Sequence, residues 1–102
     1  MLEPILVTGS SGQVGGAVVR LARSCGHSVH APLRAQLDLT DSRSIRAVIA
    51  EGKWRAIINC AAYTAVDRAE SESGAAFRIN AEAVDLLSQE CASRAARLVH
   101  FS

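Results

Sequence analysis

Three glycines near the start of the chain have the spacing of an anion-binding loop. Gly9, Gly12 and Gly15 lie three residues apart in the segment TGSSGQVG. The first would allow a tight turn out of a strand, the second would let backbone approach a pyrophosphate, and the third would let a helix pack close to a sheet. Free N–H groups at the helix start would bind the anion. The pattern therefore predicts a dinucleotide site.

The position of this loop in the chain decides between two interpretations of it. Loops are rich in glycine for conformational reasons alone, so the spacing in isolation is a weak signal. Between a buried strand and an amphipathic helix, the same spacing favours a bound dinucleotide. No Gly-Lys-Ser or Gly-Lys-Thr follows, so the loop is not a P-loop of the ATP-binding type.

Residues after the second expected strand bear on the choice between NAD and NADP. An acidic residue there favours NAD because it accepts hydrogen bonds from the ribose, whereas an arginine favours the 2′-phosphate of NADP. Leu33 and Arg34 stand at this place, and neither is acidic. Arg34 either binds the 2′-phosphate or is an ordinary solvated arginine. Asp38 either faces the adenine edge or is a turn residue beside a helix cap.

The elements that must position these residues alternate between strand and helix. Short apolar runs predict strands over residues 5–7, 27–33, 36–39, 56–62 and 97–102, the third of them very short. The first helix has an apolar face made of Val14, Ala17, Val18, Leu21, Ala22 and Cys25.

Two further helices are predicted from capping residues and apolar stripes. Asp41 is a suitable N-cap for a helix whose inner face is Ile45, Val48 and Ile49. Ser71 or Ser73 begins a longer helix. Its stripe consists of Ala76, Ile79, Asn80, Ala83, Leu86, Leu87 and Cys91.

This alternation predicts an α/β fold with a parallel sheet and right-handed crossovers. We expect a doubly wound, Rossmann-like sheet of about five strands in the order 3-2-1-4-5, with three helices. Residues 1–102 would form one NAD(P)-binding domain that is incomplete at its C-terminal end. The last strand has no following helix to cover it, so we expect the chain to be the N-terminal part of a longer protein.

Composition narrows the class of protein. The chain has 102 residues, of which 49% are hydrophobic and 21% charged, and its net charge is +1. These values indicate a globular domain and disfavour a nucleic-acid partner. No apolar run approaches the roughly 18 residues of a membrane helix, and no signal peptide is evident. Three widely spaced cysteines indicate reduced, mostly buried thiols in the cytoplasm.

One segment resembles the signature of a known enzyme family. Residues 59–72, NCAAYTAVDRAESE, strongly resemble the signature of the dTDP-4-dehydrorhamnose reductases, which belong to the extended short-chain dehydrogenase/reductase superfamily. The glycine loop, LDLTD at 37–41 and VHFS at 99–102 are similar to the same family. The resemblance runs through the whole chain. It implies NAD(P)H-dependent reduction of the C4 keto group of dTDP-4-dehydro-L-rhamnose, giving dTDP-L-rhamnose.

The resemblance also implies residue roles. The pyrophosphate cradle would consist of Gly9, Gly12, Gln13, Val14 and Gly15. Asp38 and Leu39 would flank the adenine. The nicotinamide side would be lined by Ala61, Ala62 and Tyr63, and the nucleotide sugar would be bordered by Thr64, Val66 and Asp67. All of these positions lie at carboxyl ends of expected parallel strands, where open α/β sheets bind ligands.

The chain departs from the family pattern in three respects. Leu33 stands where members often have an acid, which favours NADPH over NADH. Ala17 stands where some members have a glutamate that binds Mg²⁺ at a dimer interface, so a metal site is not expected here. The catalytic Ser or Thr and the Tyr-x-x-x-Lys pair would follow Ser102, so this chain alone holds no catalytic residue.

Several alternatives remain open at this stage. Asn80 would be either a structural amide bonded to a neighbouring strand or part of the active-site architecture. Tyr63 and Trp54 could be packing residues. The complete protein could instead be a non-catalytic nucleotide-binding regulatory subunit, or a nucleotide-sugar epimerase or dehydratase. A homodimer is compatible with the resemblance, but the sequence leaves the oligomeric state open.

Overall fold

Strands alternate with helices along the chain. The computed structural model describes residues 3–33, 35–39, 41–60 and 81–101. In chain order its elements are β1 (Ile5–Thr8), α1 (Gln13–Ser24), β2 (Val29–His30), α2 (Ser42–Ala50), β3 (Ala56–Asn59), α5 (Ala83–Ser93) and β4 (Arg97–His100).

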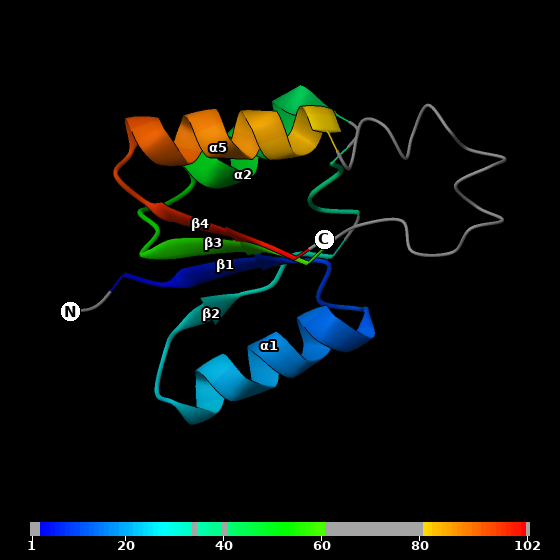
Figure 1. The fold of residues 1–102 in the computed structure, drawn as a ribbon, viewed down its shortest axis with the longest axis vertical. Coiled ribbons are helices and arrows are strands. Elements are labelled where there is room, and N and C mark those ends of the chain that lie inside the picture. The colour runs from blue at the N-terminus through cyan, green and yellow to red at the C-terminus, as the bar shows by residue number, and fades with distance from the viewer. Residues whose placement is uncertain (1–2, 34, 40, 61–80, 102) are drawn as a thin grey trace, which may run out of the picture.

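The four strands of the described residues form one parallel sheet in the order β2-β1-β3-β4. Ile5 is paired with Val29 on one side and with Ala56 on the other, which makes β1 an inner strand. Helix α1 covers one face of the sheet, whereas α2 and α5 lie together on the other (Figure 1). The prediction of a Rossmann-like, doubly wound sheet is therefore confirmed.

The predicted short strand at residues 36–39 is wrong. The backbone N–H groups of Gln36 and Leu37 both donate to the carbonyl oxygen of Leu33, at 2.8 and 2.9 Å. Groups held in a turn cannot join the hydrogen-bond ladder of a sheet. The observed order is thus the predicted one without its outermost strand. Strand β2 is also shorter than predicted, because Pro32 lacks the N–H that a longer ladder needs.

The buried face of α1 differs from the predicted one. Gly15 and Val19 are the buried residues of this helix, whereas Val14 is 50% and Leu21 67% exposed. Val19 packs with Ile5 and other apolar residues of the sheet. The predicted residue Val18 also packs against this cluster. Gly15 has no side chain and so adds nothing to an apolar pattern, and counting apolar side chains alone therefore placed the face only partly correctly.

The larger core lies between the sheet and the pair α2 and α5. The predicted inner face of α2 is confirmed, since Ile45, Val48 and Ile49 are buried. The described part of the long helix buries the residues its stripe predicted, Ala83, Leu87 and Cys91. The predicted member Leu86 is only partly buried and packs against the same cluster. The predicted members Ala76, Ile79 and Asn80, and the start at Ser71 or Ser73, lie outside the described residues.

Trp54 is buried, whereas the three cysteines differ in their exposure. Trp54 is 8% exposed, and its indole N–H donates to the Ile49 carbonyl at 3.0 Å, so it is a packing residue. All three cysteines are free, but only Cys91 is buried; Cys60 is half-buried and Cys25 is exposed. The expectation of mostly buried thiols is therefore wrong for Cys25. None of the helices in the described ranges has the length and apolar character to cross a membrane.

Candidate functional site

The glycine loop joins the buried strand β1 to α1 through a tight turn. Gly9 has a φ of 71°, a left-handed conformation that favours glycine. The N–H of Gly12 donates to the Gly9 carbonyl oxygen at 3.1 Å, and α1 begins at the next residue, Gln13. The predicted strand, loop and helix are therefore present in the predicted order.

Gly15 and Gly12 are glycines for different physical reasons. A Cβ atom added to Gly15 would lie 2.0 Å from the carbonyl oxygen of Gly9, so the loop can rest on the helix only if this residue has no side chain. A Cβ atom at Gly12 would meet only that oxygen, at an ordinary 3.5 Å. Gly12 is also exposed, with φ −82° and ψ 172°, which any residue adopts. The fold does not require glycine at position 12, whereas a bound phosphate would.

The first turn of α1 is suited to an anion. Among the described residues, no side chain caps this helix end, and the first turn holds no acidic residue. Its early N–H groups have no acceptor within the helix and carry the positive end of the helix dipole. Gln13 and Val14 are both exposed beside them. These residues fit the pyrophosphate group that the spacing predicts.

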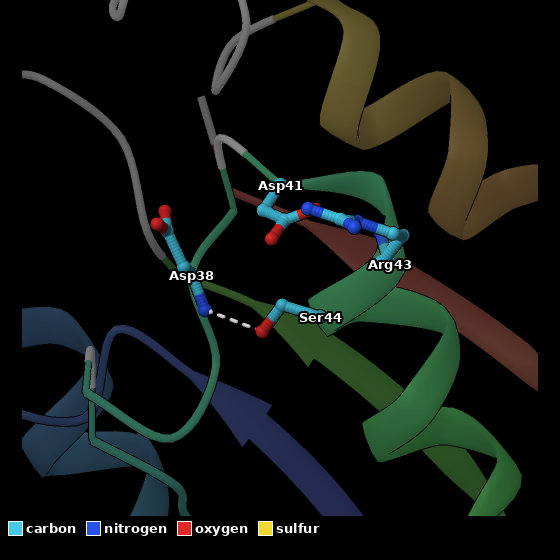
Figure 2. Close-up of polar contacts among 4 residues, drawn as sticks. All are labelled: Asp38, Asp41, Arg43 and Ser44. Carbon is cyan, nitrogen blue, oxygen red and sulfur yellow. Dashed lines mark hydrogen bonds and ion pairs between the residues drawn. The ribbon is translucent and has the colours of Figure 1, made fainter.

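Asp38 is held at its backbone beside the start of α2. Its N–H donates to Ser44 Oγ at 2.9 Å, and its carbonyl oxygen accepts from the N–H of Asp41 at 3.1 Å. The Asp38 carboxylate points away from α2 (Figure 2). Asp38 is therefore in a turn beside the helix cap, as one interpretation predicted, and this turn leaves its carboxylate directed away from the helix.

Two leucines and a cap fix this turn. Leu37 is 5% and Leu39 8% exposed, and both belong to the larger core. Asp41 caps α2 as predicted, because its Oδ1 accepts from the N–H of Arg43 at 3.0 Å. Sequence reasoning missed Ser44, whose position in the first turn after a predicted N-cap was the available signal.

The structure places only part of the predicted site. Gly9, Gly12, Gln13, Val14 and Gly15 lie together at the carboxyl end of β1. The other site residues, namely Arg34, Ala61, Ala62, Tyr63, Thr64, Val66 and Asp67, lie outside the described residues. Cys60 directly precedes that segment, and burial raises the pKa of its thiol.

Two features of the described residues bear on a metal site. The methyl group of Ala17 cannot coordinate a cation at the position where the resemblance would place a Mg²⁺ ligand. Within the described ranges, no three His, Cys, Asp or Glu side chains are grouped in a way that could hold a metal ion.

Comparison with known protein families identifies the family of the chain. Residues 3–102 match the family described as the RmlD substrate binding domain. The chain belongs to this family. The matched residues include the glycine loop and the turn at Asp38. The expectation from the sequence signature is thus confirmed at the level of family.

Individual relatives agree with this assignment to the RmlD family. The dTDP-4-dehydrorhamnose reductase of Mycolicibacterium smegmatis is 40% identical over 102 residues, which are 100% of this chain and 31% of that protein. The dTDP-4-keto-6-deoxy-D-glucose reductase of Streptomyces niveus is 39% identical over 102 residues and is covered to 35%. The chain therefore spans about a third of the length of these relatives.

A solved structure shows the same fold. The crystal structure of dTDP-4-dehydrorhamnose reductase from Bacillus anthracis, in complex with NADP, superposes with a TM-score of 0.85 at 31% identity. The superposition covers 96% of this chain and 35% of that one. The described sheet and helices therefore share the architecture of this part of the NADP-bound structure.

Proposed function

We propose that the complete protein reduces the C4 keto group of dTDP-4-dehydro-L-rhamnose with NADPH, and that this chain is its cofactor-binding part. The observation that carries the proposal is the contrast between Gly15, which the fold requires, and Gly12, which it does not. A glycine that stands where a Cβ atom would fit is expected at a position that faces a ligand. Family membership supplies the class of reaction.

The cofactor would extend along the carboxyl edge of the sheet. The pyrophosphate would bind at Gly9, Gly12, Gln13, Val14 and Gly15, through the backbone of the loop and the first turn of α1. Asp38 would face the adenine. Leu39 is buried in the core, so it would contribute its main chain rather than its side chain.

Arg34 is proposed from its place after the second strand, and the remaining contacts are proposed from the resemblance. Arg34 would bind the 2′-phosphate, and the nicotinamide side would be formed by Ala61, Ala62 and Tyr63. Thr64, Val66 and Asp67 would border the nucleotide sugar. NADPH, when bound, supplies the hydride for the carbonyl carbon. A Tyr-x-x-x-Lys pair beyond Ser102 would supply the proton for the oxygen.

The substrate class is supported by two relatives of similar identity. One is named for dehydrorhamnose and the other for 4-keto-6-deoxy-D-glucose, and both names describe dTDP-linked 4-keto sugars. We therefore propose a dTDP-linked 4-keto-6-deoxyhexose as the class, with the dehydrorhamnose as the first substrate to test. We further propose that the protein acts in the cytoplasm, since its three cysteines are free.

The decisive experiment follows NADPH oxidation by the complete protein. Added dTDP-4-dehydro-L-rhamnose should start oxidation, and the product should be the C4 alcohol. Omitting the sugar and replacing it by its already reduced product are the controls. NADPH binding without oxidation would favour the regulatory subunit. Conversion of the sugar to a product of the same oxidation level, without net NADPH consumption, would favour an epimerase or dehydratase.

A further inference from the structure

A polar ladder crosses the carboxyl ends of three neighbouring strands. Thr8 ends β1, Asn59 ends β3 and His100 ends β4, and the strand register pairs Thr8 with Asn59 and Asn59 with His100. The Thr8 hydroxyl donates to Asn59 Oδ1 at 2.5 Å. Asn59 Nδ2 lies 3.0 Å from His100 Nδ1. These strand ends lie close together in Figure 1.

The ladder lies at the border of the larger core. Side chains alternate along a strand, so Thr8 and Asn59 share the sheet face of Leu6 and Ile57, which pack in that core. Thr8 is 1% and Asn59 0% exposed, and they are the buried polar residues of the described ranges. Buried polar groups are stabilising only when their hydrogen bonds are satisfied, so the geometry of this pair is tightly constrained.

The hydrogen bonds give the ladder a direction. Because the Thr8 hydroxyl donates to Oδ1, the amide nitrogen of Asn59 faces the His100 ring. An amide nitrogen only donates, so Nδ1 of His100 must accept. The tautomer that fits this contact carries its proton on Nε2. The orientation of one buried amide therefore fixes the tautomer of a histidine two strands away from the glycine loop.

We propose that Asn59 is a positioning residue that ties the start of the glycine loop to the end of β4. Thr8 directly precedes Gly9, on whose carbonyl oxygen the loop closes. The backbone of Asn59 adds a second link to the end of β4, since its carbonyl oxygen accepts from the N–H of Phe101 at 3.1 Å. The inference rests on the proposed function only in taking NADPH as the ligand of the loop.

The first test reads the His100 ring and needs no cofactor. Asn59→Asp replaces the donor that faces His100 by an acceptor, so the ring should move its proton to Nδ1. Ring ¹⁵N spectra of the histidine-labelled complete protein should show Nδ1 unprotonated in the parent and protonated in the variant. His27 and His30 are internal controls that should not change. An unchanged His100 tautomer in Asn59→Asp would overturn the ladder.

A second variant keeps this test decisive if Asn59→Asp fails to fold. Thr8→Val preserves the shape of the side chain but removes the hydroxyl that donates to Asn59 Oδ1. The preference of the amide for its parent orientation should then weaken, and the His100 ring should show a larger share of the tautomer protonated at Nδ1. Thr8→Ser retains the hydroxyl and should restore the parent spectrum.

The second test measures positioning through NADPH affinity. Thr8→Val should raise the Kd for NADPH about tenfold, which corresponds to about 1.4 kcal/mol, and Thr8→Ser should restore it. Trp54→Phe is the matched control, because it also removes a buried side-chain hydrogen bond but lies before β3 rather than at its carboxyl end.

The outcomes separate the positioning role from plain stability and from the proposed function. If Thr8→Val lowers the melting temperature as Trp54→Phe does but leaves the Kd for NADPH unchanged, the positioning role is overturned. If the parent protein itself fails to bind NADPH, the proposed function fails. The tautomer switch in Asn59→Asp would still establish the ladder in that case.

Discussion

Gly15 lies so close beneath Gly9 that no side chain fits between them. A Cβ atom on Gly15 would stand 2.0 Å from the Gly9 carbonyl oxygen and 2.6 Å from its carbon. Both neighbours are backbone atoms, so the strain could be relieved only by moving the loop away from α1. The first prediction follows from this contact.

Gly15→Ala should destabilise the protein by roughly 1–3 kcal/mol, the usual cost of overpacking a tight contact. The measurement is the thermal unfolding midpoint by circular dichroism. Gly16→Ala is the matched control, because its Cβ would meet Arg20 Nη1 and Ser10 O at 3.4 Å, where small shifts suffice. Equal midpoints for the two variants would contradict the close contact.

Gly12→Val should leave the fold intact and weaken NADPH binding at least about tenfold. The added side chain has room in the protein but would occupy the place of the phosphate. Calorimetric titration measures the affinity, and circular dichroism confirms the fold. Gly52→Ala changes an exposed glycine before β3 and should bind NADPH normally. If Gly12→Val bound NADPH as tightly as the parent, the assignment of Gly12 to the pyrophosphate cradle would be wrong.

Ser44→Ala should weaken NADPH binding several-fold, because it leaves the N–H of Asp38 without its side-chain acceptor. Such a loss is typically worth about 1 kcal/mol. Reduced nicotinamide mononucleotide lacks the adenine that Asp38 is proposed to face, so its affinity should not change. Ser42→Ala, at an exposed serine of the same helix, is the control. If Ser44→Ala weakened the binding of both ligands equally, the effect would not arise from the adenine contact proposed for Asp38.

Cofactor choice is predicted from Leu33 and Arg34. A charge-assisted bond from Arg34 to the 2′-phosphate would be worth roughly 1.5–3 kcal/mol, so NADPH should exceed NADH about ten- to a hundredfold in kcat/KM. Arg34→Ala should erase most of this preference and leave NADH use nearly unchanged. Leu33→Asp should improve NADH use. Equal kcat/KM for both cofactors in the parent would show that Arg34 does not select between them.

The three thiols should differ in reactivity and in pH dependence. Burial raises the pKa of Cys60, and burial together with Glu90 raises that of Cys91. A raised pKa lowers the thiolate fraction at neutral pH, and only the thiolate is nucleophilic. Exposed Cys25 should therefore react first with iodoacetamide, while Cys60 labelling should accelerate as the pH rises. Peptide mass spectrometry after short exposures measures this order. Equally fast labelling of Cys60 and Cys25 at neutral pH would contradict it.

The sequence predicted best where one physical cause dominated. The glycine loop was found because Gly9 needs a positive φ and Gly15 allows a close approach. Helix α2 was found because Asp41 caps it and its apolar stripe is simple. In each case the signal lies within a few neighbouring residues, so no knowledge of distant contacts was needed.

The failures come from contacts that lie beyond the local pattern. Alternating Leu37, Asp38 and Leu39 look like a strand, but the alternation reflects two leucines anchored in the core while the backbone turns. The polar ladder was missed as a unit because Thr8, Asn59 and His100 are up to 92 positions apart and meet only through strand register.

Glycine is required by the fold at position 15 but not at position 12, and this difference affects how the sequence of such a chain can diverge. A substitution at position 15 is opposed by folding itself, so every descendant that folds would keep the loop seated on α1. A substitution at position 12 meets no such barrier. A single change there would yield a stable protein that lacks the proposed dinucleotide site and keeps its other surfaces, so the proposed cofactor can be lost in one step without loss of the fold.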